Sequence, residues 1–179
     1  LLSAENWGLG FGTEGTQPTG TASAEELKEY NAYYVGDAEE KKIYLTFDCG
    51  YENGNSSAIL DALKKHNAPA TFFVVGTRVK EGAEVLKQEV AQGCEIGNHT
   101  WDHANLAKLS MEKVNKQYDK TADLVKKLVG YDITLLRPPY GAISAKMRKK
   151  LKHPMVLWNT DTLDWKSKNT KAIMKEIKK

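Results

Sequence analysis

The sequence predicts an α/β fold in which a parallel β-sheet is covered by helices. The first observation is a regular alternation of short apolar runs, typical of buried strands, with longer segments whose apolar residues recur at helical spacing. The second is size, since 179 residues with 41% hydrophobic and 27% charged content fit one domain with a sizeable core. The third is that polar clusters directly follow the strands, where reacting groups gather in sheets of this class.

The composition argues against several classes of function. The net charge is +3, from 26 basic and 23 acidic residues, and the lysines are spread along helices, which disfavours nucleic acid as a partner. No apolar run approaches the roughly 20 residues that cross a bilayer. Two cysteines, Cys49 and Cys94, do not make a disulfide scaffold. The chain begins Leu-Leu-Ser, so we expect a mature or trimmed form whose signal segment is absent.

Residues 1–40 are expected to form an N-terminal arm and a short helix. Residues 1–22 are rich in Gly, Thr and Ser and predict an irregular arm. Apolar residues spaced two apart are expected to pack this arm onto the domain: Trp7, Leu9 and Phe11. A helix capped by Ser23, with two glutamates in its first turn, is expected to end near Gly36.

Residues 41–179 are expected to form the main domain. The first strand should begin at Ile43, because apolar and polar side chains alternate from there to Asp48. The other expected strands are 70–75, 94–97, 133–136 and 155–158. The expected helices are 56–68, 82–92, 110–129, 144–151 and one that starts near Thr170. Five strands are too few to close a barrel, so either the sheet is open or a carboxyl-terminal part is missing.

Two of the polar clusters contain candidate catalytic and metal-binding residues. Asp48, at the carboxyl end of a strand, is a candidate general base, although it can instead cap the turn that follows. The second cluster is 98–103, Asn-His-Thr-Trp-Asp-His. On a helical turn, His99 and His103 would face the same way and reach one metal ion, whereas a chance pair of histidines is the alternative.

The third and fourth clusters follow later strands. In Arg137-Pro138-Pro139-Tyr140-Gly141 the paired prolines stiffen the backbone, so a backbone N–H such as that of Tyr140 can point into a site. The alternative for this cluster is a rigid connection with a solvated Arg137. The fourth cluster is Asp161-Thr162-Leu163-Asp164-Trp165, whose indole either stacks on a sugar ring or belongs to the core.

Together the four clusters resemble the motifs of polysaccharide deacetylases that carry the NodB homology domain. The order and approximate separations agree for Thr46-Phe47-Asp48, His99-Thr100-Trp101-Asp102-His103, Arg137 to Gly141 and Asp161 to Trp165. The resemblance covers about Lys41 to the end. Two further segments look like the peptidoglycan deacetylases of spore-forming bacteria, including those that act on muramic acid: Tyr51-Glu52-Asn53-Gly54 and Asn6-Trp7-Gly8.

The resemblance implies a fold and a biological setting. The fold is a distorted, incomplete (β/α) barrel, here expected to lack its last strand and helix. The function is a metal-dependent hydrolase that removes acetyl groups from an N-acetylated polysaccharide, with a peptidoglycan glycan strand as the expected partner. Such a protein is expected to be secreted or associated with the cell wall, to be linked to sporulation, and to be a monomer.

The resemblance also implies roles for single residues. His99 and His103 would hold a divalent metal ion, expected to be Zn2+ (zinc), and Asp48 would be the general base. The other implied roles are Arg137 holding Asp48, the Tyr140 N–H stabilising the oxyanion, Pro139, Tyr140 and Trp165 contacting the sugar, and Asp161 orienting a catalytic acid.

Two departures from the family pattern leave alternatives open. Cys49 stands where most of the family has a second aspartate that binds the metal, so it is either a thiolate ligand or a bystander. The last family motif, a Leu-rich strand ending in His-Asp that supplies the acid, has no counterpart, and His66 and His153 are poorly placed to replace it. We therefore expect residues 1–179 alone to show little or no N-deacetylase activity. The alternatives are an inactive sugar-binding or structural module, and a chitin-oligomer deacetylase or acetylxylan esterase.

Overall fold

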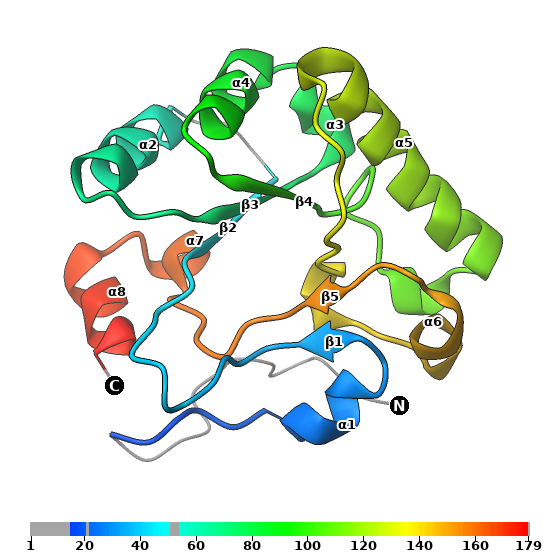
Figure 1. The fold of residues 1–179 in the computed structure, drawn as a ribbon, viewed down its shortest axis with the longest axis horizontal. Coiled ribbons are helices and arrows are strands. Elements are labelled where there is room, and N and C mark those ends of the chain that lie inside the picture. The colour runs from blue at the N-terminus through cyan, green and yellow to red at the C-terminus, as the bar shows by residue number, and fades with distance from the viewer. Residues whose placement is uncertain (1–14, 21, 51–53, 179) are drawn as a thin grey trace.

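The computed structural model describes residues 15–20, 22–50 and 54–178. Its strands form a curved central layer, and helices α2 to α6 lie along the outer side of that layer (Figure 1). Every strand pair is parallel, which confirms the α/β class expected from the alternation of strands and helices. The expected packing of Trp7, Leu9 and Phe11 lies outside the described residues, as does the Tyr51-Glu52-Asn53 segment.

Two parallel ladders make up the central layer. One has the strand order β2-β3-β4, and the other pairs β1 with β5. Leu136 joins the two ladders through isolated parallel bridges to Asn98 and to Met155. The strands are β1 (Ala32–Tyr33), β2 (Thr46–Cys49), β3 (Thr71–Val74), β4 (Glu95–Asn98) and β5 (Met155–Val156).

The five helices expected after residue 41 are all present. They are α2 (Ser56–Lys65), α4 (Ala83–Ala91), α5 (Met111–Val129), α6 (Ala145–Lys150) and α8 (Thr170–Ile177). The long helix α5 has a strong signal at each end: the Ser110 side chain accepts the N–H of Lys113, and Gly130 adopts a left-handed φ of 72°. Two four-residue helices, α3 (Gly76–Val79) and α7 (Asp164–Ser167), were not expected. None of the helices in the described segments is long and apolar enough to cross a membrane.

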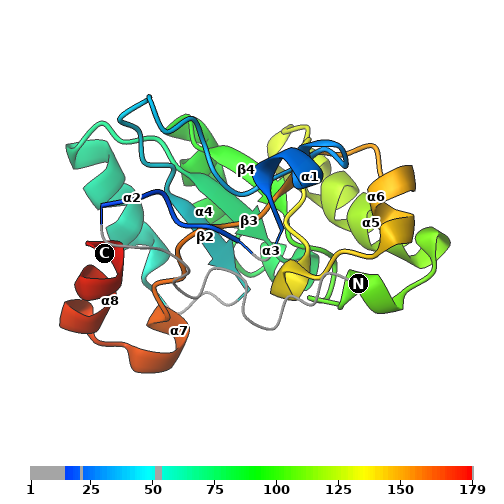
Figure 2. The ribbon, with the colours of Figure 1, turned by 90° about the horizontal axis from the view of Figure 1, so that it is seen from below.

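The register of the strands gives the sheet two chemically different faces. Asp48 pairs with Phe73 and Phe73 pairs with Gly97, so these residues form one row on what we call the inner face. On the outer face Phe47 stacks on Phe72, with ring centroids 5.1 Å apart. Figure 2 shows the same layer edge-on, with helices packed around it. The core beneath these helices includes Leu60, Leu63, Phe72, Val74, Leu86, Ile96, Val114, Val125, Leu136, Met147 and Met155.

The expected start of the first strand is wrong. β2 begins at Thr46, while Ile43 is 83% exposed and Leu45 is 41% exposed. Among the described strands β2 pairs only with β3, so it is an edge strand. Leu45 contributes its carbonyl, which accepts the N–H of Thr71, but its side chain stays partly exposed at this edge of the sheet.

The first helix is shorter than expected. α1 (Ala24–Lys28) is capped by Ser23 as anticipated, yet it does not reach Gly36. Asn31 adopts a positive φ of 54°, which breaks the helical path. The next residues, Ala32 and Tyr33, instead form β1 on the edge of the second ladder, because pairing there buries Ala32 completely against β5.

The expected strand at 133–136 is reduced to bridges at Leu136. Backbone bonds continue as far as Arg137, whose N–H donates to the Asn98 carbonyl at 2.9 Å. Pro138 and Pro139 follow, and neither has an N–H to continue the ladder. The prolines therefore turn the chain away just after Arg137.

Gly97 is required by the packing of the inner face. A Cβ atom at this position would lie 2.3 Å from two ring carbons of Phe73, whose side chain is completely buried. We expect Gly97→Ala to lower the free energy of unfolding by about 1–3 kcal/mol, the usual effect of overpacking a core. Urea denaturation measures this change. Gly82→Ala is the control, because its Cβ would make only an ordinary contact at 3.8 Å, and an equal loss in both variants would contradict the prediction.

Candidate active site

Arg137 is the centre of the candidate site. Its side chain is 3% exposed, and its guanidinium donates to four oxygens of two separate segments. Nη1 donates to Oδ1 of Asp48 at 2.8 Å, and Nη2 donates to Oγ1 of Thr46 at 2.8 Å. Nη2 also donates to the Leu157 carbonyl at 2.9 Å, and Nε to the Val156 carbonyl at 3.1 Å. The expected ion pair is confirmed, and the alternative of a solvated arginine is wrong.

An aromatic stack supports the guanidinium of Arg137. Its Cζ lies 4.2 Å from the ring centroid of Phe73 and 5.5 Å from that of Trp158. Burial lowers the pKa of Arg137, and the Asp48 carboxylate opposes this shift. A guanidinium has so high a pKa that it stays charged, and it therefore holds Asp48 as a fixed partner.

The structure brings both histidines together beside Asp48. The ring centroids of His99 and His103 are 4.9 Å apart, and Nε2 of His99 lies 3.7 Å from Oδ2 of Asp48. Nδ1 of His99 is 2.8 Å from the Arg137 carbonyl, which can only accept. Nδ1 therefore carries the hydrogen, and Nε2 keeps its lone pair free toward Asp48.

Burial keeps the two imidazoles neutral. It is the main cause that lowers the pKa of His99 and the pKa of His103, while the charge of Asp48 opposes the shift in both cases. A neutral imidazole is the form that binds a metal ion. The electrostatics of the site are therefore compatible with metal binding near neutral pH.

The expected helical turn between the histidines is absent. Residues 99–103 form a non-helical loop after β4, in which Thr100 has a φ of 70° and His103 a φ of 60°. Tyr140, in the third cluster, and Leu163, in the fourth, also have positive φ values of 62° and 54°. Strained backbone of this kind gathers at functional sites, where the surrounding structure holds it in place.

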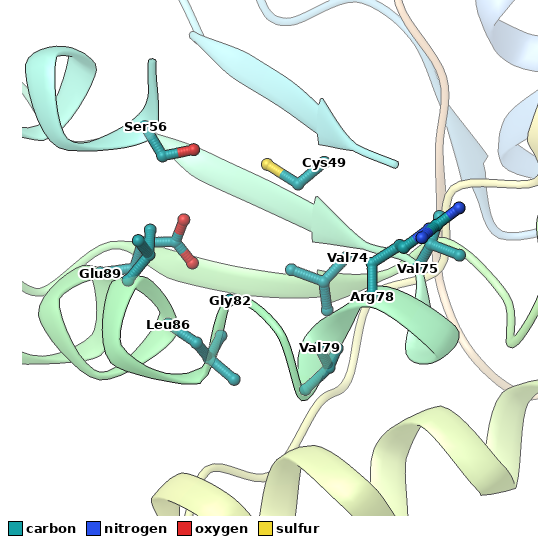
Figure 3. Close-up of a pocket in the computed structure, with 10 residues that line it drawn as sticks. Cys49, Ser56, Val74, Val75, Arg78, Val79, Gly82, Leu86 and Glu89 are labelled. Carbon is teal, nitrogen blue, oxygen red and sulfur yellow. The ribbon is translucent and has the colours of Figure 1, made fainter. Parts of the chain in front are cut away.

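Cys49 lies on the face of β2 opposite to Asp48, because consecutive strand residues point to opposite sides. Figure 3 shows its sulfur among side chains that line a pocket on the outer face, including Ser56, Val79 and Glu89. The histidines are not among the lining residues. This position supports the interpretation of Cys49 as a bystander rather than a ligand.

The Pro-Pro turn carries Tyr140 to the edge of the histidine pair. Buried Pro139 begins a short 3-10 turn, Pro139–Gly141, that places the Tyr140 ring 4.9 Å from the His103 ring in an edge-to-face contact. The Tyr140 side chain is 57% exposed, so it borders the site from the solvent side. The roles expected for its N–H and for Pro139 remain predictions.

Within the described residues, Asp161 and Trp165 form no hydrogen bond, ion pair or ring contact with Arg137, Asp48 or the two histidines. The Asp161 carboxylate accepts the N–H of Leu163 at 2.8 Å and so stabilises a turn. Trp165, on α7, is 69% exposed, which rules out the alternative that it belongs to the core. Their expected roles in orienting an acid and contacting a sugar stay predictions.

Several residues that shape the site were not predicted as site residues. Thr46 and Trp158 contact Arg137, and two amide side chains hold the histidine loop, namely Asn98 and Gln117. Thr46 lies in a quoted motif and Asn98 in the second cluster, whereas nothing in the local sequence indicated Trp158 or Gln117. The other two histidines, His66 at the end of α2 and His153 stacked on Tyr118, take no part in the cluster.

A family model described as polysaccharide deacetylase matches residues 35–155. The chain belongs to the polysaccharide deacetylase family. The match includes Asp48, both histidines and the Arg137 to Gly141 motif, whereas the fourth motif lies beyond it. The expected membership of the family is confirmed.

Individual members of the polysaccharide deacetylase family are similar over most of this chain. The peptidoglycan-N-acetylmuramic acid deacetylase PdaC of Bacillus subtilis (strain 168) is 43% identical over 141 residues, covering 79% of this chain and 30% of PdaC. The solved structure of PdaC has a TM-score of 0.73 at 42% identity, covering 79% of this chain and 70% of that one. A family 4 carbohydrate esterase pseudoenzyme (CE4) of Bacillus anthracis has a TM-score of 0.76 at 29% identity, with 82% and 53% covered.

The chain spans only part of the length of its relatives in the polysaccharide deacetylase family. It spans 57% of a 30.6 kDa protein of Geobacillus stearothermophilus, to which it is 41% identical over 152 residues. It spans 30% of PdaC. What these longer proteins do as wholes is therefore carried over to this chain only as a proposal.

Proposed function

We propose that this chain contains the active site of a metal-dependent hydrolase that removes acetyl groups from N-acetylated sugars of peptidoglycan. The observation that carries the proposal is the position of Asp48, between the Arg137 guanidinium at 2.8 Å and Nε2 of His99 at 3.7 Å. The similarity to PdaC, named as a peptidoglycan deacetylase, supports this substrate class. We further infer that the parallel sheet is part of an incomplete barrel, and that the protein acts outside the cell or at the cell wall.

Asp48 acts as the general base in this proposal. Arg137 holds Oδ1, which leaves Oδ2 directed toward the histidines and toward the position of a reacting water. A carboxylate fixed in this way can accept the proton of the water as it attacks the acetyl carbonyl. Because the arginine is itself held by four oxygens, the base stays oriented throughout the reaction.

His99 and His103 would hold the divalent metal ion. The donor set fits zinc better than magnesium or calcium, because both donors are imidazoles and Nε2 of His99 is free. No group of three His, Cys, Asp or Glu side chains suited to a metal ion occurs among the described residues, so part of the coordination would be left to water and substrate. When bound, such an ion polarises the acetyl carbonyl as a Lewis acid.

Residues of the Pro-Pro turn and of the fourth cluster would bind the substrate and assist its reaction. The Tyr140 N–H stabilises the negative charge that develops on the acetyl oxygen. Pro139, the exposed Tyr140 ring and the exposed Trp165 indole contact the sugar. The leaving nitrogen must still receive a proton, and we propose that Asp161 orients the acid that supplies it.

Acetate release tests this proposal. We expect residues 1–179 to hydrolyse an activated O-acetyl ester in a chelator-sensitive manner that added zinc restores, because an ester oxygen leaves with little acid assistance. Release from N-acetylated peptidoglycan should be slower, because an amide nitrogen must receive a proton before it leaves, and such acid catalysis typically contributes about 10²–10⁴-fold in rate. Chitin oligomers and acetylxylan are the competing substrates, and preferential release from either would reassign the substrate.

A second candidate function is an inactive sugar-binding module. The absence of a three-donor cluster among the described residues and the similarity to a pseudoenzyme favour it. Peptidoglycan binding with no hydrolysis of either ester or amide, at any zinc concentration, would support the module and exclude the enzyme. The His99→Ala, His103→Ala double variant is the control, and it should lose any zinc-dependent hydrolysis.

A further inference from the structure

The loop that carries both histidines is held in an unfavourable backbone conformation. Thr100 is β-branched and completely buried, yet its φ is 70°, and His103 has a φ of 60°. Side chains with a Cβ rarely adopt this region, so the loop keeps its shape only if surrounding contacts fix it. The question is which contacts do so.

One side of the loop is fixed by the backbone of the first two residues of α3. The Gly76 N–H donates to the Thr100 carbonyl at 3.0 Å, and the Thr77 N–H donates to the Trp101 carbonyl at 2.8 Å. A Cβ at Gly76 would lie 2.5 Å from the Trp101 ring, so the glycine permits this close approach. These contacts satisfy the carbonyls of the loop but not its N–H groups.

Three consecutive N–H groups of the loop, those of residues 100–102, donate to two amide side chains. Asn98, which is completely buried, accepts the Thr100 N–H at 2.9 Å and donates to the Tyr118 carbonyl of α5 at 2.9 Å. The second is Gln117, also on α5. Its Oε1 accepts the N–H of Trp101 at 2.8 Å and the N–H of Asp102 at 3.3 Å.

We infer that Gln117, which lies outside all four motifs, is a positioning residue for the histidine pair. A single oxygen accepts two consecutive N–H groups midway between His99 and His103, and thus fixes the direction in which the chain enters His103. His99 is anchored separately, through its bond to the Arg137 carbonyl. The separation of the two imidazoles therefore depends on the part of the loop that Gln117 holds.

The inference deepens the proposed function, because it concerns the residues proposed to hold the metal ion. Residues that orient metal ligands typically change metal affinity or activity by about 10–100-fold when they are replaced. Gln117 is suited to this role by its place on α5, a rigid helix of 19 residues capped at both ends. α5 also buries Val114 and Tyr118 in the core, so the backbone from which the Gln117 side chain extends is held in place.

The experiment compares Gln117→Met, Gln117→Glu and the wild type, with Gln88→Met as the matched control on the exposed side of α4. Zinc affinity is measured by calorimetry, and exchange of the Trp101 and Asp102 amide hydrogens is measured by NMR on the metal-free chain. For Gln117→Met we expect zinc affinity to fall about 10–100-fold and the exchange of both amides to accelerate at least about tenfold. Gln117→Glu, which keeps an acceptor oxygen, should retain most of the affinity, and Gln88→Met should match the wild type.

The outcomes separate this inference from the proposed function. A wild-type chain that binds no zinc contradicts the metal site of the proposed function, and the exchange rates of the two amides then decide the role of Gln117 on their own. Unchanged exchange in Gln117→Met overturns the inference. If the wild type binds zinc and Gln117→Met binds it with the same affinity, the inference is also overturned. A loss of affinity in Gln117→Met that equals the loss in Gln88→Met would also overturn it, since it would reflect only general destabilisation.

Discussion

Replacing Arg137 by methionine is expected to lower the free energy of unfolding by about 3 kcal/mol and the turnover number by about 100-fold. The stability loss arises because the Val156 and Leu157 carbonyls and the Thr46 hydroxyl lose their donor, while Asp48 loses its counter-ion. We place it at the lower end of values for a broken buried ion pair, since the Asp48 side chain is 39% exposed and water can solvate it. The loss of turnover follows from an unoriented base.

The Arg137→Lys variant makes the test sharper. Lysine keeps the charge but cannot present three nitrogens to four oxygens, so we expect it to recover only a small part of both losses. Arg78→Lys on α3 is the matched control, because Arg78 forms a surface ion pair with Glu81 at 3.5 Å that is worth at most about 1 kcal/mol. Urea denaturation and steady-state kinetics give the two quantities. If Arg137→Lys kept full turnover, the rigid geometry would not matter for the base.

Replacing Asp48 by asparagine should reduce hydrolysis of the best substrate by about 10²–10⁴-fold, the usual contribution of a general base. The variant should remain folded, because the amide oxygen of asparagine can still accept a hydrogen bond from Nη1 of Arg137. The wild type and variant are compared by acetate release at saturating zinc. The expected loss lies in the turnover number more than in substrate affinity.

Asp61→Asn provides the control for this change, since Asp61 is an exposed carboxylate on α2. It should have normal activity. Zinc affinity of the Asp48→Asn variant is measured in parallel, so that loss of the base can be separated from loss of the ion. Activity within a few-fold of the wild type in Asp48→Asn would show that the proton is accepted by another group.

Features with strong local causes were correctly predicted from the sequence. α5 was predicted to within a residue because Ser110 caps its start and Gly130 permits its end. The four clusters were expected to follow strands. The first three, which contain Asp48, the two histidines and Arg137, lie close together because the strands are parallel. The ion pair of Arg137 with Asp48 was expected from the resemblance to the deacetylase motifs, and the paired prolines indicated only that the turn after Arg137 is rigid.

Features decided by tertiary contacts could not be predicted in this way. Ile43 and Leu45 alternate like a buried strand, but burial depends on a neighbour, and β2 has none on that side among the described strands. The histidines come together through a strained loop instead of a helical turn, and the spacing of four residues is compatible with both. Gln117 acts on amides 15 and 16 residues away, and no periodic pattern indicates such a contact.

The hydrogen bonds of Arg137 also determine when the site can form during synthesis of the chain. The arginine follows its partners Asp48 and Thr46 by 89 and 91 residues, and it precedes Val156 and Leu157 by 19 and 20 residues. Helices such as α2 and α4 can form from local contacts, whereas contacts this distant require a large loop to close first. At ribosomal rates of about 5–20 residues per second, the time between the synthesis of Asp48 and that of Arg137 is on the order of 5–20 seconds. Helices α2 to α5, which precede Arg137, thus have time to form before the base gains its partner, and partly synthesised chains carry the histidines and the aspartate without a working site.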